Sequence, residues 1–112
     1  MPKIYKMIVL SKPTAGKEDA YNDWYQNTHL KQMCSIEGVK SAQRFMRTRE
    51  VVPGFAWPYA AIYEIETDDI DGVLARIRGV AGSENLWVSD ALDTSEIYAS
   101  IFESFGENVE AG

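Results

Sequence analysis

Four stretches of the chain carry the hydrophobic pattern of β-strands. Residues 4–10 form a nearly continuous apolar run with β-branched members, which is typical of a strand covered on both faces. Residues 59–66 and 96–105 alternate between two faces, and so does the stretch from residue 39 toward residue 50. In that last stretch, strict alternation predicts that Val39 and Phe45 share one face and that Arg44 lies on the other.

Two segments between these strands have helical periodicity. The first follows a turn at residues 11–16, where Thr14 is a candidate N-cap, and aromatic residues then recur at helical spacing. We expect a break near Asn27, after which His29 begins a second short turn. Gly38 then ends this unit, because glycine commonly follows a helix C-terminus.

The second helical segment opens at Asp68 and Asp69 and has the clearest amphipathic pattern in the chain. Its apolar positions are Ile70, Val73, Leu74, Ile77 and either Val80 or Ala81. Residues 83–92 follow as a loop with the apolar stretch Leu86, Trp87 and Val88. This loop either folds onto its own helices or a partner chain, or it closes a pocket as a lid.

The order of these elements, β-α-β-β-α-β, predicts an α+β ferredoxin-like fold, in which an antiparallel four-stranded sheet carries both helices on one face. The other face would be an apolar patch larger than a monomer normally exposes. We therefore expect a homodimer that packs these sheet faces together and buries on the order of 1,200–2,000 Å² or more. One domain is expected over residues 1–106, with a flexible acidic tail at residues 107–112.

Composition narrows the class of protein. A hydrophobic share of 46% and an aromatic share of 12% in 112 residues indicate one folded domain. The formal charge of −6 disfavours nucleic-acid binding. The single cysteine, Cys34, suits a reducing cytoplasm, and the chain has no apolar run long enough for a membrane span. One histidine and one cysteine cannot supply the usual soft-ligand set, so no metal is expected.

His29 is the only histidine in the chain. Imidazole is the side chain whose unperturbed pKa lies nearest neutrality, so His29 is the candidate for proton transfer. Residues four apart share a helix face, which places Tyr21, Tyr25 and Met33 on the same stripe. The alternative is a structural histidine that is hydrogen-bonded at the helix break.

The residues around His29 form a recognisable motif. The sequence Trp24-Tyr25-x-x-x-His29-Leu30, then Ile36-x-Gly38-Val39-x-x-Ala42-x-Arg44-Phe45, resembles the dimeric α/β-barrel superfamily, especially its EthD-like and stress-responsive barrel branches. The match is close over residues 19–45 and extends elsewhere only as topology. The chain departs from the family where Glu37 replaces a frequent proline, and in having one histidine where several branches use more.

The resemblance implies a dimer of ferredoxin-like subunits whose sheets join into a barrel, with a pocket between sheet and helices that His29 lines. Many members act without metal or organic cofactor on small aromatic or polyketide-like molecules. We therefore predict no cofactor for this chain. The partners expected are a second copy of the chain and a small apolar or aromatic ligand.

The predicted catalytic residues are His29, as general acid/base, and Tyr25, as a hydrogen-bond donor to a developing oxyanion. The predicted substrate-binding residues are Tyr21, Trp24, Met33, Arg44, Tyr63, Trp87 and Phe102. The forked guanidinium of Arg44 suits a carboxylate or phenolate. The alternative, which the basic run at Arg44, Arg47 and Arg49 favours, is a solvated surface position or pairing with Glu64 and Glu66. For Tyr63 and Phe102, the alternative is simple packing at the dimer interface.

The leading hypothesis is a cofactor-independent enzyme that performs an isomerisation, cyclisation or lyase reaction on a small aromatic or polyketide-like substrate. Proton abstraction next to a carbonyl group suits a single histidine best. The alternatives are a cofactor-free or haem-dependent monooxygenase, and a non-catalytic small-molecule-binding or stress-response protein. An RNA-binding ferredoxin-like module is disfavoured by the acidic charge and by the absence of an aromatic RNA-binding motif.

Overall fold

The computed structural model describes residues 2–112, which form one antiparallel sheet with helices packed against it. The strands are β1 (Lys3–Ser11), β2 (Val39–Met46), β3 (Tyr59–Thr67) and β4 (Tyr98–Glu103). Their spatial order is β2-β3-β1-β4, and every neighbouring pair is antiparallel. The predicted β-α-β-β-α-β order is confirmed, and the chain has a ferredoxin-like α+β fold.

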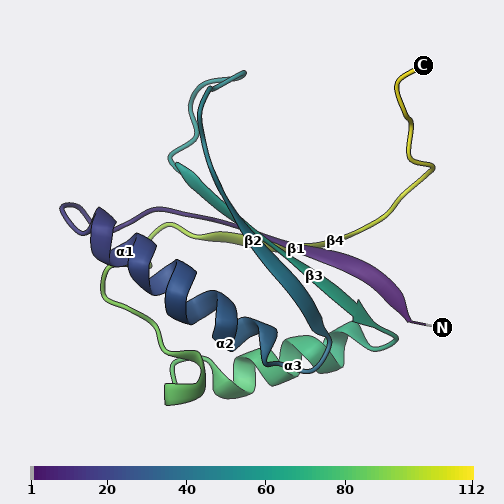
Figure 1. Ribbon diagram of the computed structural model, residues 1–112, viewed down its shortest axis with the longest axis horizontal. Helices are drawn as coiled ribbons and strands as arrows, with labels where there is room; N and C mark the ends of the chain where they lie inside the picture. The colour runs from purple at the N-terminus through teal and green to yellow at the C-terminus, as the bar shows by residue number, and fades with distance from the viewer. Residues whose placement is uncertain (1) are drawn as a thin grey trace.

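Two helical units cover one face of this sheet (Figure 1). The helical elements are α1 (Glu18–Trp24), the π-helical turn η1 (Tyr25–His29), α2 (Leu30–Cys34), α3 (Ile70–Val80) and the short 3-10 helix η2 (Glu84–Leu86). The side chain of Asp69 caps α3 by accepting a hydrogen bond from the backbone amide of Gly72 at 3.0 Å. The predicted opening of the second helix is therefore confirmed.

The predicted break near Asn27 is wrong, because the helix continues through this point as a π turn. The backbone amide of Leu30 donates to the carbonyl of Tyr25, five residues earlier. The wider turn accommodates one extra residue, so the buried side chains of this helix include Tyr25 and Leu30, five residues apart. His29, which lies between them in sequence, stays half-buried. Single π turns of this kind occur frequently at functional sites.

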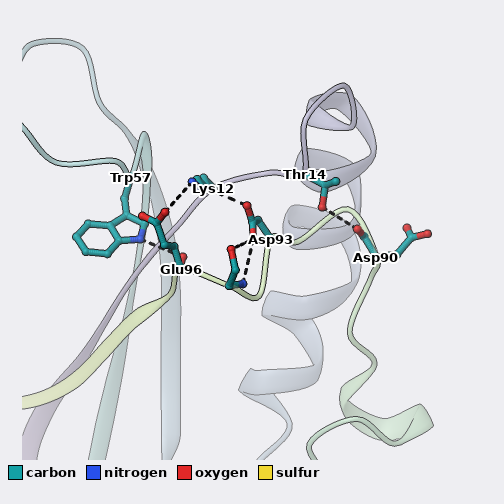
Figure 2. Close-up of polar contacts among 7 residues, drawn as sticks. Lys12, Thr14, Trp57, Asp90, Asp93 and Glu96 are labelled. Carbon is teal, nitrogen blue, oxygen red and sulfur yellow. Dashed lines mark hydrogen bonds and ion pairs between the residues drawn. The ribbon is translucent and has the colours of Figure 1, made fainter.

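Thr14 does not cap α1, contrary to the prediction, and α1 has no side-chain cap. The Thr14 hydroxyl instead donates to the carbonyl of Asp90 at 2.9 Å (Figure 2). Figure 2 shows two further contacts of the segment that precedes β4: Lys12 lies 3.2 Å from the carboxylate of Glu96, and the indole N–H of Trp57 donates to the Glu96 carbonyl at 3.1 Å. These contacts fasten this segment to the end of β1 and to the residues before β3.

Strand β2 departs from simple alternation. A bulge between Val39 and Ser41 shifts the pairing with β3 by one residue. Val39 is therefore buried against the helices, on the same side as Arg44, whereas Phe45 lies on the opposite side. The predicted grouping of Val39 with Phe45 is wrong for this reason. Strand β2 also ends at Met46, before residue 50, and β4 is shorter than the predicted stretch.

The core lies between the sheet and the helices, and its least exposed side chains are Tyr21, Tyr63, Ile65 and Val73. Gly38, in the turn before β2, has a φ of +102°, a conformation that favours glycine. A Cβ atom on Gly38 would lie 2.8 Å from the Val73 side chain. The turn from α2 to β2 therefore passes so close to α3 that only glycine fits.

In the described residues, no helix covers the opposite face of the sheet. The side chains on this open face include Ile4, Lys6, Ile8, Leu10, Phe45, Ala60, Ile62, Glu64, Tyr98 and Phe102. Ile4 and Phe102 are about half exposed. The β2–β3 connection and the C-terminal tail project from the body of the molecule (Figure 1). No helix in residues 2–112 is long and apolar enough to cross a membrane.

Candidate functional site

Arg44 forms the centre of a polar cluster between α1 and the sheet. It pairs in register with Ala61 of β3, and this small neighbour leaves room for the long arginine side chain to lie over the sheet. The guanidinium carbon lies 5.5 Å, 4.9 Å and 5.4 Å from the ring centres of Tyr21, Tyr25 and Tyr59, respectively. Three aromatic rings therefore stabilise one half-buried cation.

Hydrogen bonds fix the position of this guanidinium. Arg44 Nη2 donates to the Asn22 side-chain oxygen at 2.6 Å, and the Asn22 amide donates to the Tyr59 hydroxyl at 3.3 Å. Tyr59 in turn donates to Glu18 at 3.0 Å. None of the ion pairs among the described residues includes Arg44. The predicted alternative of a solvated arginine paired with Glu64 or Glu66 is thus not what the structure shows.

Three tyrosines of the cluster, Tyr21, Tyr25 and Tyr63, remain protonated near neutral pH. The Tyr21 and Ser11 hydroxyls are 2.6 Å apart, and the Tyr63 hydroxyl donates to that of Tyr25 over a longer 3.5 Å. Burial raises the pKa of Tyr21, Tyr25 and Tyr63, and this effect outweighs the opposing influence of Arg44 on the first two. These hydroxyls can therefore donate hydrogen bonds but do not act as bases.

A hollow of about 270 Å³ opens beside this cluster. It is lined by Asn22, Arg44, Phe45, Met46 and Tyr59. The volume is slightly below the range of roughly 300–1,000 Å³ typical of small-molecule sites. The hollow therefore combines the Arg44 cation, the hydrogen-bonding side chains of Asn22 and Tyr59, and apolar walls. This arrangement suits a small anionic or phenolic compound.

His29 lies in a separate group of aromatic side chains, here called the aromatic nook, which consists of Trp24, Tyr25, His29 and Trp87. Its ring centre lies 4.7 Å from that of Trp24 and 5.0 Å from that of Tyr25, with the Tyr25 ring nearly perpendicular to it. Nδ1 of His29 is buried without a hydrogen-bond partner. Burial lowers the pKa of His29 from 6.5 to about 4, so the ring is neutral near pH 7 and can accept a proton. The alternative of a hydrogen-bonded structural histidine does not describe this Nδ1 atom.

The apolar loop after α3 is fastened to the helix that carries His29. Trp24 Nε1 donates to the Trp87 carbonyl at 3.1 Å, and Gln32 joins the loop by accepting from the Trp87 amide at 2.9 Å and donating to the Glu84 carbonyl at 2.8 Å. Leu86 is buried. The loop is therefore folded onto its own helices, while the Trp87 ring stays half-exposed beside Trp24.

The structure brings four of the predicted site residues into the polar cluster. These are Tyr21, Tyr25, Arg44 and Tyr63. His29, Trp24 and Trp87 form the adjoining nook, which shares only Tyr25 with the cluster, and Met33 is buried in the core. Phe102 lies on the open face of the sheet, on the side away from the helices, so it is not part of either group.

The prediction missed three members of the polar cluster, namely Ser11, Asn22 and Tyr59. Sequence signals point to two of them, Asn22 and Tyr59. Asn22 lies four residues after Glu18, and residues at this spacing share a helix face. Tyr59 and Tyr63 lie four residues apart on one strand and share its face. Among residues 2–112, no group of three or more His, Cys, Asp and Glu side chains could hold a metal ion.

Comparisons with known proteins support the assignment of the fold. No protein-family model matches the chain, and no curated protein matches it in sequence. Among solved structures, a protein from Shewanella loihica PV-4 described as a putative monooxygenase is similar, with a TM-score of 0.63 and 16% identity over 96% of this chain and 99% of that one.

Two further solved structures share the fold. An EthD (ethyl tert-butyl ether D) family protein from Bacillus halodurans C-125 has a TM-score of 0.55 and 15% identity over 91% of this chain and 99% of its own. A NIPSNAP family protein of unknown function from Agrobacterium tumefaciens strain C58 has a TM-score of 0.57 and 12% identity over 91% and 88%. The chain therefore shares its ferredoxin-like fold with these three solved structures.

Proposed function

We propose that this protein is an enzyme that performs acid/base chemistry on a small aromatic or polyketide-like compound with an acidic oxygen. The observation that supports the proposal is the half-buried guanidinium of Arg44, which lines a hollow and has no carboxylate partner among the described residues. A cation that is partly desolvated and unneutralised attracts an anion strongly. In a chain with a net charge of −6, such a local positive site is all the more distinctive.

In this proposal, Arg44 binds a carboxylate or enolate oxygen of the substrate. The guanidinium is preorganised by Asn22, so little conformational freedom is lost when the anion binds. Tyr59 and Met46 lie on the same side of the sheet as Arg44 and provide apolar walls for a flat substrate. The same cation would stabilise the negative charge that develops when a carbon acid loses a proton beside a carbonyl group.

His29 is the proposed general base. Its ring is neutral near pH 7, so the unprotonated ring nitrogen can accept a substrate proton. The buried Nδ1 atom has no hydrogen-bond partner among the described residues. Tyr25 contacts both His29 and Arg44, which makes its ring the connection between base and anion site. The base would be weak, because a desolvated imidazolium is a strong acid, and a bound anion would counteract this by favouring the protonated ring.

We also propose a homodimer formed by the open faces of two sheets. The apolar side chains of this face, such as Ile8 and Ile62 on the central strands, lack a covering element within one chain. Phe45 lies on the open face and also lines the Arg44 hollow at the sheet edge. Dimerisation would therefore immobilise one wall of the proposed site.

A direct test uses benzoate and benzamide, which have the same shape but differ in charge. Binding is measured by nuclear magnetic resonance titration of the wild type, Arg44→Met and the matched control Arg47→Met, whose arginine lies on the exposed β2–β3 connection. We expect the wild type and the control to prefer benzoate, and Arg44→Met to lose that preference. Equal binding of both compounds to the wild type contradicts the anion site.

The chemistry is tested with phenylpyruvate, an aromatic carboxylate whose enol form converts to the ketone by proton transfer at carbon. The loss of enol absorbance is followed with wild type, His29→Ala and His29→Gln. General acid/base catalysis is worth typically 10²–10⁴-fold, so a fall of less than roughly tenfold in His29→Ala excludes His29 as the base. Binding of benzoate to His29→Ala reports whether the anion site is intact.

The second candidate function is monooxygenation, which the description of the Shewanella loihica protein suggests. The same hollow would hold a phenolic substrate, with Arg44 stabilising the phenolate. Oxygen uptake with a phenol distinguishes this function from proton transfer, and a Soret band in purified protein would indicate bound haem. Binding of benzoate without either activity would instead support a non-catalytic binding protein.

A further inference from the structure

Lys6 and Glu64 form an ion pair in the middle of the open sheet face. They are register partners on the two central strands, β1 and β3, and Lys6 Nζ lies 3.6 Å from Glu64 Oε1. Both side chains are about half exposed in the single chain. The pair continues sideways to Phe102 on β4 and Ser41 on β2, so it forms part of a row that crosses the whole sheet.

On the two central strands, the rows on one side of this pair are apolar. Ile8 pairs with Ile62 in the next row, and Leu10 pairs with Ala60 in the row after that. On the other side, Ile4 is exposed opposite Glu66. A hollow of about 380 Å³ adjoins the ion pair and is lined by Lys6, Ser41, Ala42, Gln43, Phe45, Ile62 and Glu64. The ion pair therefore lies between the apolar row of Ile8 and Ile62 and the row that Ile4 shares with Glu66.

Covering this face would desolvate the pair. If apolar side chains of a second copy lay over Lys6 and Glu64, the loss of hydration would oppose association. The same pair of the second copy could instead lie over them in reverse order. Each Lys6 would then lie next to the Glu64 of its own chain and the Glu64 of the other chain, and each Glu64 would likewise lie next to two lysines. A two-fold axis between the two sheets produces this reversal when it is perpendicular to the line from Lys6 to Glu64 and passes midway between them.

We infer that Lys6 and Glu64 set the register of the homodimer by meeting the same two residues of a second copy as a ring of four alternating charges. This inference rests on the proposed sheet-to-sheet dimer. The apolar rows would supply most of the association free energy, whereas the charge ring would select one alignment among those that bury similar apolar areas. The occupant of the open face is thus a second copy of this chain.

The test is charge reversal at each position. Lys6→Glu gives four negative charges at the dimer centre and Glu64→Lys gives four positive charges, so each variant alone is expected to weaken the dimer on the order of a hundredfold or more. The double variant Lys6→Glu/Glu64→Lys keeps the alternation and should dimerise like wild type. An equimolar mixture of the two single variants should form a heterodimer. Dimer dissociation constants are measured by analytical ultracentrifugation.

A matched control uses the pair Lys3 and Glu103, which lie 3.6 Å apart on the opposite face of the sheet. Reversal of either charge there should leave the dimer unchanged. Lys6→Gln and Glu64→Gln provide milder variants in case a reversal disturbs folding, and each should weaken the dimer because it leaves the opposing charge without a partner. Circular dichroism of every variant reports folding.

The outcomes separate the two levels of the inference. A monomeric wild type overturns both the proposed dimer and the charge ring. A dimeric wild type whose dissociation constant is unaffected by the reversals and by both glutamine variants overturns the charge ring alone. Weakened single variants that recover dimerisation on mixing support the inference, because loss of folding cannot be reversed by a complementary charge.

Discussion

The guanidinium carbon of Arg44 lies 4.9 Å from the ring centre of Tyr25, and this contact joins strand β2 to the π turn. The same Tyr25 ring meets the imidazole of His29 almost at a right angle. A cation and a neutral base are therefore placed on one tyrosine that is itself buried. The proposed chemistry depends on this connection.

Asn22→Ala should weaken anion binding without removing the cation. Asn22 accepts from Arg44 at 2.6 Å and donates to Tyr59, so its loss frees the guanidinium to move. A hydrogen bond to a charged group contributes about 1.5–3 kcal/mol, which corresponds to a fall in benzoate affinity of roughly tenfold or more. Asn27→Ala is the matched control, because Asn27 bonds only to Asp23 on the exposed side of the helix. Unchanged affinity in Asn22→Ala would show that Asn22 does not position Arg44.

His29 should titrate far below an ordinary histidine. It is the only histidine, so its ring signals are assigned without ambiguity in a nuclear magnetic resonance titration. Burial lowers the pKa of the folded state to about 4, compared with 6.5 for an exposed ring. A titration midpoint at or above pH 6 would contradict this, and would indicate a solvated ring or an unrecognised acidic partner.

The same shift predicts how stability depends on pH. The folded state binds a proton on His29 less readily than the unfolded state does. The contribution of His29 to the free energy of unfolding is therefore complete above pH 6.5 and is lost as pH falls toward 4. The loss across this window is about 3 kcal/mol. His29→Gln should lack this part of the pH dependence. Urea unfolding at pH 7.5 and pH 4.5 measures the change in unfolding free energy for the wild type and for His29→Gln. The same change in both proteins would refute the prediction.

Gly38→Ala should destabilise the fold. The backbone at Gly38 has a φ of +102°, and a Cβ atom there meets the Val73 side chain at 2.8 Å. Strain and overpacking together are expected to cost about 1–3 kcal/mol of unfolding free energy. Gly79→Ala is the opposite control, since Gly79 lies within α3 with open space around it and alanine there should stabilise by about 0.5–1 kcal/mol. Equal changes in unfolding free energy for Gly38→Ala and Gly79→Ala would exclude the close approach of the turn to α3.

Gln32→Ala should release the loop that follows α3. The Gln32 side chain bonds to the Trp87 amide and to the Glu84 carbonyl, so both contacts disappear together. We expect the Trp87 amide to exchange its hydrogen about tenfold faster or more, as expected for the loss of one or two hydrogen bonds. Gln26→Ala, on the exposed side of the π turn, should leave this exchange rate unchanged. Slow exchange in Gln32→Ala would mean that Trp24 alone holds the loop.

Much of the architecture follows from the sequence because its causes are local. Alternation and helical periodicity identify four strands and two helices, and Asp69 is in the right place to cap the second helix. The order of elements then permits few topologies, and the apolar residues left on the second sheet face predict the open face. The candidate residues Tyr25, Arg44 and Tyr63 were likewise identifiable from their types and positions.

Tertiary structure decided the remaining features because they depend on contacts between distant segments. Thr14 bonds to Asp90 instead of capping its own helix. The bulge after Val39 places the Val39 side chain on the same side of β2 as Arg44. The π turn also escapes a periodicity argument, since the extra residue is accommodated only where Tyr25 and Leu30 both find buried positions. The sequence by itself determined which elements form and which faces are apolar. Long-range packing determined which side chains meet, because the pleat and the helix repeat fix direction within an element but not register between elements.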